Sequence, residues 1–222
     1  MARLCPEGVA IYSTRILFEP TMHGLRAMRD HVERASLELS SEGICQIIAF
    51  CCTMGSMVGG LDYDGEMIDL IEKRTSTPAT TTTTAVRASL AALRVKRIAV
   101  ATPYTLEINL HEKEELERRG FLVTKIMGYH DHVHPRELKN EMIGRLPPEV
   151  AYEMGLKVNS EESEAIFISC TNFRAIEIIE KLEKRTGKPV ISSNQATLWY
   201  ALRKLGLKDS IKGFGGLMEL HL

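Results

Sequence analysis

The stretch Ile166-Phe-Ile-Ser-Cys-Thr-Asn172 joins a strand-forming apolar run to a reactive side chain at its end. An earlier stretch, Ile47-Ile-Ala-Phe-Cys-Cys-Thr53, repeats this pattern, and small or amide side chains then lead towards a helical pattern in both. In an open parallel α/β sheet, ligands bind at the carboxyl ends of the strands, where the next helix begins. The two stretches therefore predict an α/β fold with a two-cysteine active site at Cys52 and Cys170.

Length and composition exclude several classes of protein. The chain has 222 residues and a formal net charge of -1, which allows one large domain or two small ones. No run of basic residues indicates nucleic-acid binding, and no apolar stretch approaches the roughly 18 residues that a membrane-spanning helix needs. The N-terminus lacks the apolar core of a signal peptide. We therefore expect a cytoplasmic protein with neither nucleic acid nor membrane as a partner.

The five cysteines do not have the spacing of a disulfide framework, and no CxxC motif occurs. Cys45 and Cys51 are flanked by Ile or Phe and are expected to pack as small apolar side chains. Cys52 and Cys170 differ because each stands where a strand ends and a helix begins. We expect the helix dipole and the free N–H groups there to lower the pKa of both thiols, which favours the reactive thiolate.

Strands and helices alternate along the rest of the chain, as is typical of a parallel α/β protein. Strands are predicted at residues 8–12, 44–51, 97–101, 121–127, 165–169 and 190–193. Helices are predicted at residues 22–39, 86–93, 107–119, 148–156, 174–185 and 194–205.

Two segments align without gaps and suggest an internal repeat. Pro78-Ala-Thr-Thr-Thr-Thr-Thr-Ala85 matches Pro189-Val-Ile-Ser-Ser-Asn-Gln-Ala196, and each follows its own cysteine-bearing strand and helix. The repeat predicts two similar α/β halves, and if the halves face each other, Cys52 and Cys170 flank one small ligand. The alternative is a chance match of short hydroxyl-rich segments beside two structural cysteines.

Two further features have both a functional and a structural interpretation. Arg15 follows the first predicted strand, so its planar guanidinium is a candidate to hold a substrate carboxylate, whereas a lone arginine is often simply solvated. His130, His132 and His134 alternate along the chain, but their spacing is not that of a common zinc site. We expect a solvated or substrate-adjacent loop there and no metal.

Six motifs, in their order and spacing, resemble the aspartate/glutamate racemase superfamily, in particular its branch of maleate cis-trans isomerases and arylmalonate decarboxylases. They are Ala49-Phe-Cys-Cys-Thr-Met-Gly-Ser56, Pro78-Ala-Thr-Thr-Thr82, Val100-Ala-Thr-Pro-Tyr104, Asn140 with Ile143-Gly-Arg145, Ser169-Cys-Thr171, and Pro189 to Trp199. The resemblance implies two Rossmann-like halves with four-stranded parallel sheets, related by a pseudo-twofold axis, and a site in the cleft between them. It also implies a homodimer that uses neither metal nor cofactor. We expect residues 1–98, completed by residues 194–222, to form the first half and residues 99–193 to form the second.

The resemblance also assigns roles to individual residues. Cys52 resembles the first catalytic cysteine, a position that is glycine in the decarboxylases, and Cys170 resembles the second. Thr53, Tyr104 and Thr171 match positions whose hydroxyls or amides bind the substrate carboxylate.

Three further positions carry a substrate-binding expectation. Met54 stands where a serine is often found, and Asn140 matches an asparagine near the substrate. Arg15 stands where the isomerases have a substrate-binding asparagine, a difference that could mark a larger or differently charged acid.

The resemblance implies that decarboxylases of this branch use a single cysteine, so the presence of two cysteines disfavours decarboxylation. The first expectation is isomerisation of a small carboxylic acid of the maleate type, with a covalent adduct at Cys52 and proton handling by Cys170. Racemisation of an amino acid such as aspartate or glutamate by two thiols is the second. A protein that binds a carboxylate without catalysis is the third.

Overall fold

Two parallel sheets form the centre of the computed structural model, which describes residues 1–220. The larger sheet has the order β4-β3-β5-β6, formed by β3 (Arg97–Thr102), β4 (Leu122–Gly128), β5 (Ala165–Ile168) and β6 (Val190–Ser192). The smaller sheet pairs β1 (Ile48–Phe50) with β2 (Ala79–Thr81), with Ile48 opposite Ala79. The predicted α/β class with parallel sheets is confirmed.

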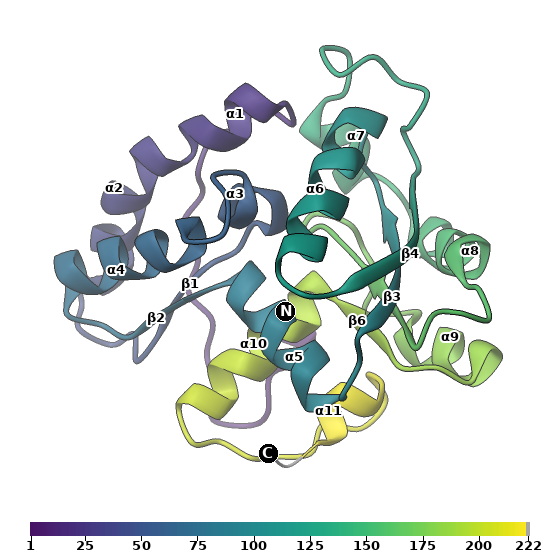
Figure 1. Cartoon of the computed structure of the whole chain (residues 1–222). Helices are drawn as coiled ribbons and strands as arrows, with labels where there is room; N and C mark the ends of the chain where they lie inside the picture. Colours follow the sequence, from purple (N-terminus) through teal and green to yellow (C-terminus); the bar gives the residue numbers. More distant parts are fainter. Residues whose placement is uncertain (221–222) are drawn as a thin grey trace.

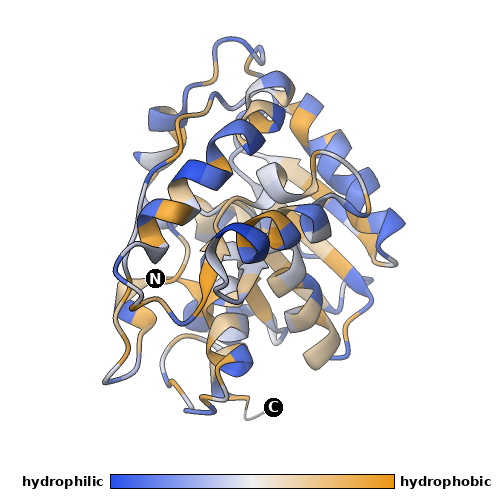
Figure 2. Ribbon diagram, turned by 90° about the vertical axis from the view of Figure 1, so that its left-hand side faces the viewer, coloured by the Kyte–Doolittle hydropathy of each residue, from blue (hydrophilic) through white to orange (hydrophobic). Residues whose placement is uncertain are grey.

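Helices surround both sheets (Figure 1). Those of the N-terminal part are η1 (Ala2–Leu4), α1 (Met22–Ala27), α2 (Arg29–Ser40), α3 (Thr53–Met57), α4 (Tyr63–Thr75) and α5 (Thr82–Ala92). The later ones are α6 (Leu106–Arg118), α7 (Asn140–Gly144), α8 (Pro148–Val158), α9 (Ile179–Thr186), α10 (Ser193–Lys204) and α11 (Gly216–Glu219). In Figure 2 the interior strands are largely hydrophobic, and the surrounding helices alternate between hydrophilic and hydrophobic residues.

The segment Gly8–Tyr12 is not a strand, contrary to the prediction. Val9 donates its N–H to Pro6 O in a turn, and the side chains of Ile11 and Tyr12 are exposed. A strand needs a hydrogen-bonded neighbour, and within the described residues this segment has none. The smaller sheet therefore has two strands in the described chain, where four were expected.

Other boundaries also differ from the sequence prediction, including that of the helix predicted at 86–93, which begins at Thr82. The predicted helix 22–39 is divided at Met28, because His31 donates its N–H to Met28 O, three residues back, in place of the α-helical acceptor. The strand predicted at 44–51 is reduced to β1. The helix predicted from Arg174 begins only at Ile179, because residues 171–178 form turns that follow Cys170.

The two aligned segments adopt the same local structure. In each, a short strand is followed at once by a capped helix: Thr81 accepts from the N–H of Thr84 at the start of α5, and Ser192 accepts from that of Gln195 at the start of α10. The two helices pack against each other between the sheets (Figure 1). The last long helix thus packs on α5 of the N-terminal part, while the boundary between residues 98 and 99 stays a prediction.

Candidate active site

A cavity of about 380 Å³ lies at the carboxyl ends of the strands. Cys52, Tyr104 and Cys170 line it, and each stands two residues beyond the end of its strand, β1, β3 and β5 respectively. Apolar side chains of α1 and α2, such as Leu25 and Val32, line another part of the cavity. The cavity therefore brings together thiols from two different sheets, at the position where parallel α/β proteins bind ligands.

Cys52 is held at the start of α3, where it is the N-cap residue. Its Sγ accepts a hydrogen bond from the Gly55 N–H at 3.3 Å, and its carbonyl accepts one from the Ser56 hydroxyl at 2.7 Å. A Cβ at position 55 would lie 2.9 Å from the Cys52 sulfur, so glycine is needed for this close approach. The thiol is thus fixed by its own helix start.

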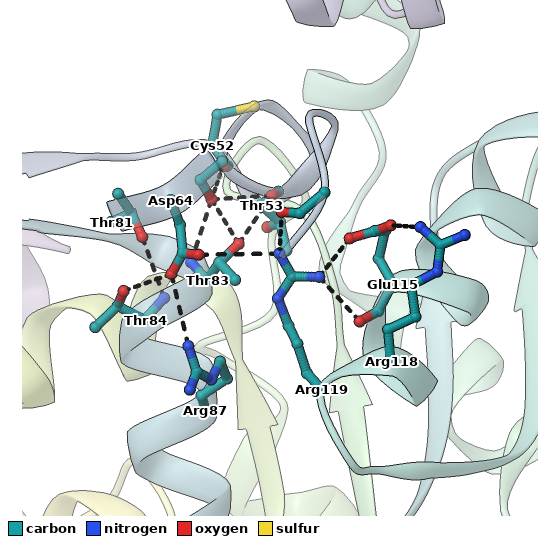
Figure 3. A network of polar contacts seen from close by, with 12 residues as sticks. Cys52, Thr53, Asp64, Thr81, Thr83, Thr84, Arg87, Glu115, Arg118 and Arg119 are labelled. Atoms are coloured by element: carbon teal, nitrogen blue, oxygen red, sulfur yellow. Dashed lines mark hydrogen bonds and ion pairs between the residues drawn. The ribbon is translucent and has the colours of Figure 1, made fainter. Parts of the chain in front are cut away.

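A polar network supports the backbone around Cys52 (Figure 3). The Thr83 hydroxyl lies 2.7 Å from that of Ser56 and donates to Thr53 O at 3.4 Å. The next residue, Thr84, donates to Asp64 at 2.7 Å, and Asp64 lies 3.9 Å from the guanidinium of Arg119. The network therefore connects the loop that carries the first thiol to α4, α5 and the end of α6.

Cys170 adopts a backbone conformation that side-chain-bearing residues rarely use, with a φ of 93°. Its N–H donates to the Ser193 hydroxyl at 3.1 Å, and its Sγ accepts from the Asn172 N–H at 3.4 Å. The Tyr104 hydroxyl lies near enough to this sulfur to lower the pKa of the thiol. Two hydrogen bonds thus hold a strained residue at the cavity, which is typical of functional positions.

Burial decides the acidity of both thiols. Desolvation by burial raises the pKa of Cys52 to about 12 and that of Cys170 to about 11. The Gly55 N–H lowers the pKa of Cys52, and the Tyr104 hydroxyl lowers that of Cys170, but both effects are smaller than that of burial. The sequence-based expectation of depressed thiol pKa values is therefore wrong.

Two predicted substrate-binding residues point away from the cavity. The Thr53 hydroxyl lies 2.7 Å from that of Ser193, and Met54 is fully buried in the core cluster around β1. Neither residue lines the cavity. Both stand in the first turn of α3, and their role in binding a substrate carboxylate stays a prediction.

Three other predicted residues line the cavity: Arg15, Asn140 and Thr171. The side chain of Arg15 is exposed. Asn140 accepts from the Asn172 amide at 2.8 Å through its side chain, and the Thr171 hydroxyl donates to Cys51 O at 3.0 Å. The structure thus brings these three residues to the same cavity as the two thiols.

Sequence reasoning missed three residues that organise this region. Asn172 and Asn194 line the cavity, and Asn194 donates to Thr171 O at 2.9 Å. Ser193 connects the two halves of the site, because its hydroxyl contacts both Thr53 and the Cys170 N–H. The aligned repeat contained a signal for them, since Ser193 and Asn194 directly follow β6 just as Thr82 and Thr83 follow β2.

The histidine loop does not gather metal ligands. His130 is buried and its Nδ1 lies 2.5 Å from Pro103 O, whereas His132 and His134 are exposed. Among residues 1–220, no group of three or more His, Cys, Asp or Glu side chains is arranged to hold a metal ion. Within the same residues, no helix has the length and apolar character needed to cross a membrane.

Known proteins resemble this chain over almost its whole length. The family model described as arylmalonate decarboxylase matches residues 3–218. The arylmalonate decarboxylase of Bordetella bronchiseptica is 27% identical, over 98% of this chain and 89% of that protein. The maleate isomerase of Geobacillus stearothermophilus is 23% identical, over 99% and 87%. A mutant of the Nocardia farcinica maleate cis-trans isomerase with a covalently bound succinylcysteine intermediate has the same fold, with a TM-score of 0.88 at 23% identity over 96% of this chain and 88% of that one.

Proposed function

The chain belongs to the arylmalonate decarboxylase family, and from this membership and its two-thiol cavity we propose that it isomerises a small unsaturated carboxylic acid of the maleate type. The observation that carries the proposal is that Cys52 and Cys170, from two different sheets, line one cavity. The resemblance implies that decarboxylases of this branch use a single cysteine, so the second thiol favours isomerisation. The covalent succinylcysteine in the Nocardia farcinica enzyme supports a thiol adduct as the intermediate.

The proposed reaction begins when the Cys52 thiolate adds to one carbon of the double bond. A C–S bond forms, the π electron pair moves to the neighbouring carbon, and that carbon takes the proton of the Cys170 thiol. The central bond is now single and rotates. The Cys170 thiolate then removes the proton again, the trans double bond forms, and the C–S bond breaks to restore the Cys52 thiolate.

The residues around the thiols have complementary roles in this scheme. Arg15 supplies a positive charge for a substrate carboxylate, and Asn140 and Thr171 supply further polar contacts. The Tyr104 hydroxyl, which lowers the pKa of Cys170, stabilises the Cys170 sulfur when it becomes a thiolate. Negative charge that develops beside the cavity is thus met by donors that the fold has already placed.

Proton NMR of the protein with maleate in deuterated buffer tests this function. We expect fumarate signals with the native protein, no turnover with Cys52→Ser, and nearly full turnover with Cys45→Ser. Cys45 is the matched control because it is a partly buried cysteine that does not line the cavity. Equal activity of the two variants would show that Cys52 is not the nucleophile.

Racemisation is the second candidate, because the same two thiols also form the two-base arrangement that moves an α-proton between opposite faces. If maleate is not converted, exchange of the α-proton of aspartate or glutamate for deuterium would favour this reaction. Release of carbon dioxide from an arylmalonate would favour decarboxylation. Binding of these acids without any reaction would favour a carboxylate-binding protein. Homodimer formation stays a prediction of the family resemblance.

A further inference from the structure

A buried carboxyl group behind the site has no counter-charge in the part of the chain that the structure describes. Glu112 on α6 is 0% exposed, and neither of its carboxyl oxygens has a hydrogen-bond partner among residues 1–220. Glu115, one turn further along the same helix, is equally buried but forms ion pairs with Arg118 and Arg119. No ion pair reaches Glu112 within residues 1–220. The fold therefore satisfies one buried carboxylate of α6 and leaves the other without a counter-charge, which is costly for an ionised group.

Glu112 lies one helical turn beyond Ile108, a residue of α6 that lines the cavity. The carboxyl group of Glu112 also lies near the buried Ser169 hydroxyl, which precedes Cys170 and lowers the pKa of Glu112. Its negative charge raises the pKa of Cys52, of Tyr104 and of Cys170. These groups come from the loops that follow β1, β3 and β5, so one carboxyl group acts on all three strand ends.

Burial raises the pKa of Glu112 itself to about 7, an effect that the Ser169 hydroxyl partly opposes. The carboxyl group thus changes its charge within the physiological pH range. When it is ionised, a second negative charge on either sulfur is disfavoured by repulsion at low dielectric. When it is neutral, this repulsion is absent.

We propose that Glu112 is a positioning residue of the two-thiol site: its carboxylate adds to the cost of a thiolate at Cys52 or Cys170, which burial already disfavours, and its neutral acid adds nothing to that cost. When a proton passes from a thiol to this carboxylate, an S–H bond breaks and an O–H bond forms, so the site retains one negative charge. This inference rests on the proposed function only in taking a thiolate as the reactive form.

The test is the pH dependence of iodoacetamide alkylation, followed for each cysteine by peptide mass spectrometry. In Glu112→Gln, we expect Cys52 and Cys170 to react at nearly the native rate at about pH 6, where native Glu112 is largely neutral. Above about pH 7 the variant should react about tenfold faster, which corresponds to a downward shift of about one pKa unit. Glu114→Gln is the matched control, because Glu114 is an exposed carboxylate on the same helix.

Cys5 and Cys45 of the same samples report any general loosening of the fold, which would accelerate their alkylation as well. Glu112→Met also removes the charge while retaining an apolar side chain of similar length, and the same shift is expected of it. A native rate profile in a folded neutral variant would overturn the proposal. Because no substrate is added, this result is independent of the maleate experiment, and a failure of either proposal is seen separately.

Discussion

At the scale of single residues, the strained backbone of Cys170 distinguishes the second thiol from the first. Cys170 has a φ of 93°, in the region that favours glycine, whereas Cys52 has an extended φ of -153°. The strain is sustained by the hydrogen bonds of Ser193 and Asn172 to this residue. Conformational strain that the surrounding structure maintains is a common feature of catalytic positions.

This strain predicts different effects of glycine at the two cysteines. Cys170→Gly should be about 1 kcal/mol more stable than Cys170→Ala, because glycine adopts this conformation without strain. At position 52 the order should be reversed, since glycine there only increases the entropy of the unfolded chain. Urea unfolding of the four variants measures both differences. A Cys170→Gly variant less stable than Cys170→Ala would contradict the assignment of strain.

At the scale of elements, buried ion pairs connect the helices that support the site. Arg119, at the end of α6, forms ion pairs with Glu115 on the same helix and with Asp64 on α4. It also donates to Gly60 O, in the loop before α4, at 2.7 Å. Its side chain is 2% exposed. Asp64 in turn accepts from Thr84 on α5 (Figure 3). One guanidinium therefore connects α6 with α4, and α5 joins the same cluster through Asp64.

Removal of this guanidinium should strongly destabilise the protein. We expect Arg119→Met to lower the free energy of unfolding by about 3–5 kcal/mol, because Glu115 and Asp64 would remain buried without their counter-charge. Lys113→Met, on the same helix, should cost less than about 1 kcal/mol because its pair with Glu117 is solvent-exposed. Chemical denaturation measures both. Similar losses in the two variants would mean that burial of the cluster does not determine its contribution.

At the scale of the whole molecule, the two sheets share one core. Ile48 of β1 and Ile168 of β5 belong to the same cluster of buried residues, which also contains the two cysteines that line the cavity. In addition, α10 follows the larger sheet in sequence but packs on α5. The thiols are therefore held in place by contacts that cross from one sheet to the other.

A shared core predicts that the molecule unfolds as one unit. Trp199, the single tryptophan, is buried on α10, so its fluorescence reports on the packing between the halves. We expect its unfolding transition in urea to coincide with that of the far-ultraviolet circular dichroism signal, which reports on all helices. Cys45→Ser serves as a control whose two transitions should also coincide, because Cys45 packs against a different buried cluster from that of Trp199. Separated transitions would contradict a shared core.

Much of the fold could be predicted from local sequence patterns, and the errors of that prediction have a common origin. The strand at Arg97 and the helices that begin near Thr82 and Ser193 were predicted to within a few residues, because apolar periodicity and caps are properties of neighbouring residues. The strand predicted at Gly8–Tyr12 failed because strand formation also needs a partner. No local pattern reveals whether that partner is present.

The sequence by itself determined that two thiols stand just beyond the ends of two strands, since strand end, cysteine and following turn are consecutive in the chain. Only the tertiary structure decided that Thr53 turns to Ser193, that burial raises the pKa of both thiols, and that Glu112 is buried near them with no counter-charge from residues 1–220. The physical reason is that solvent exclusion and electrostatic repulsion depend on which distant segments surround a group. Here those segments are the start of α3, the middle of α6 and the end of β5, which meet only in the folded chain.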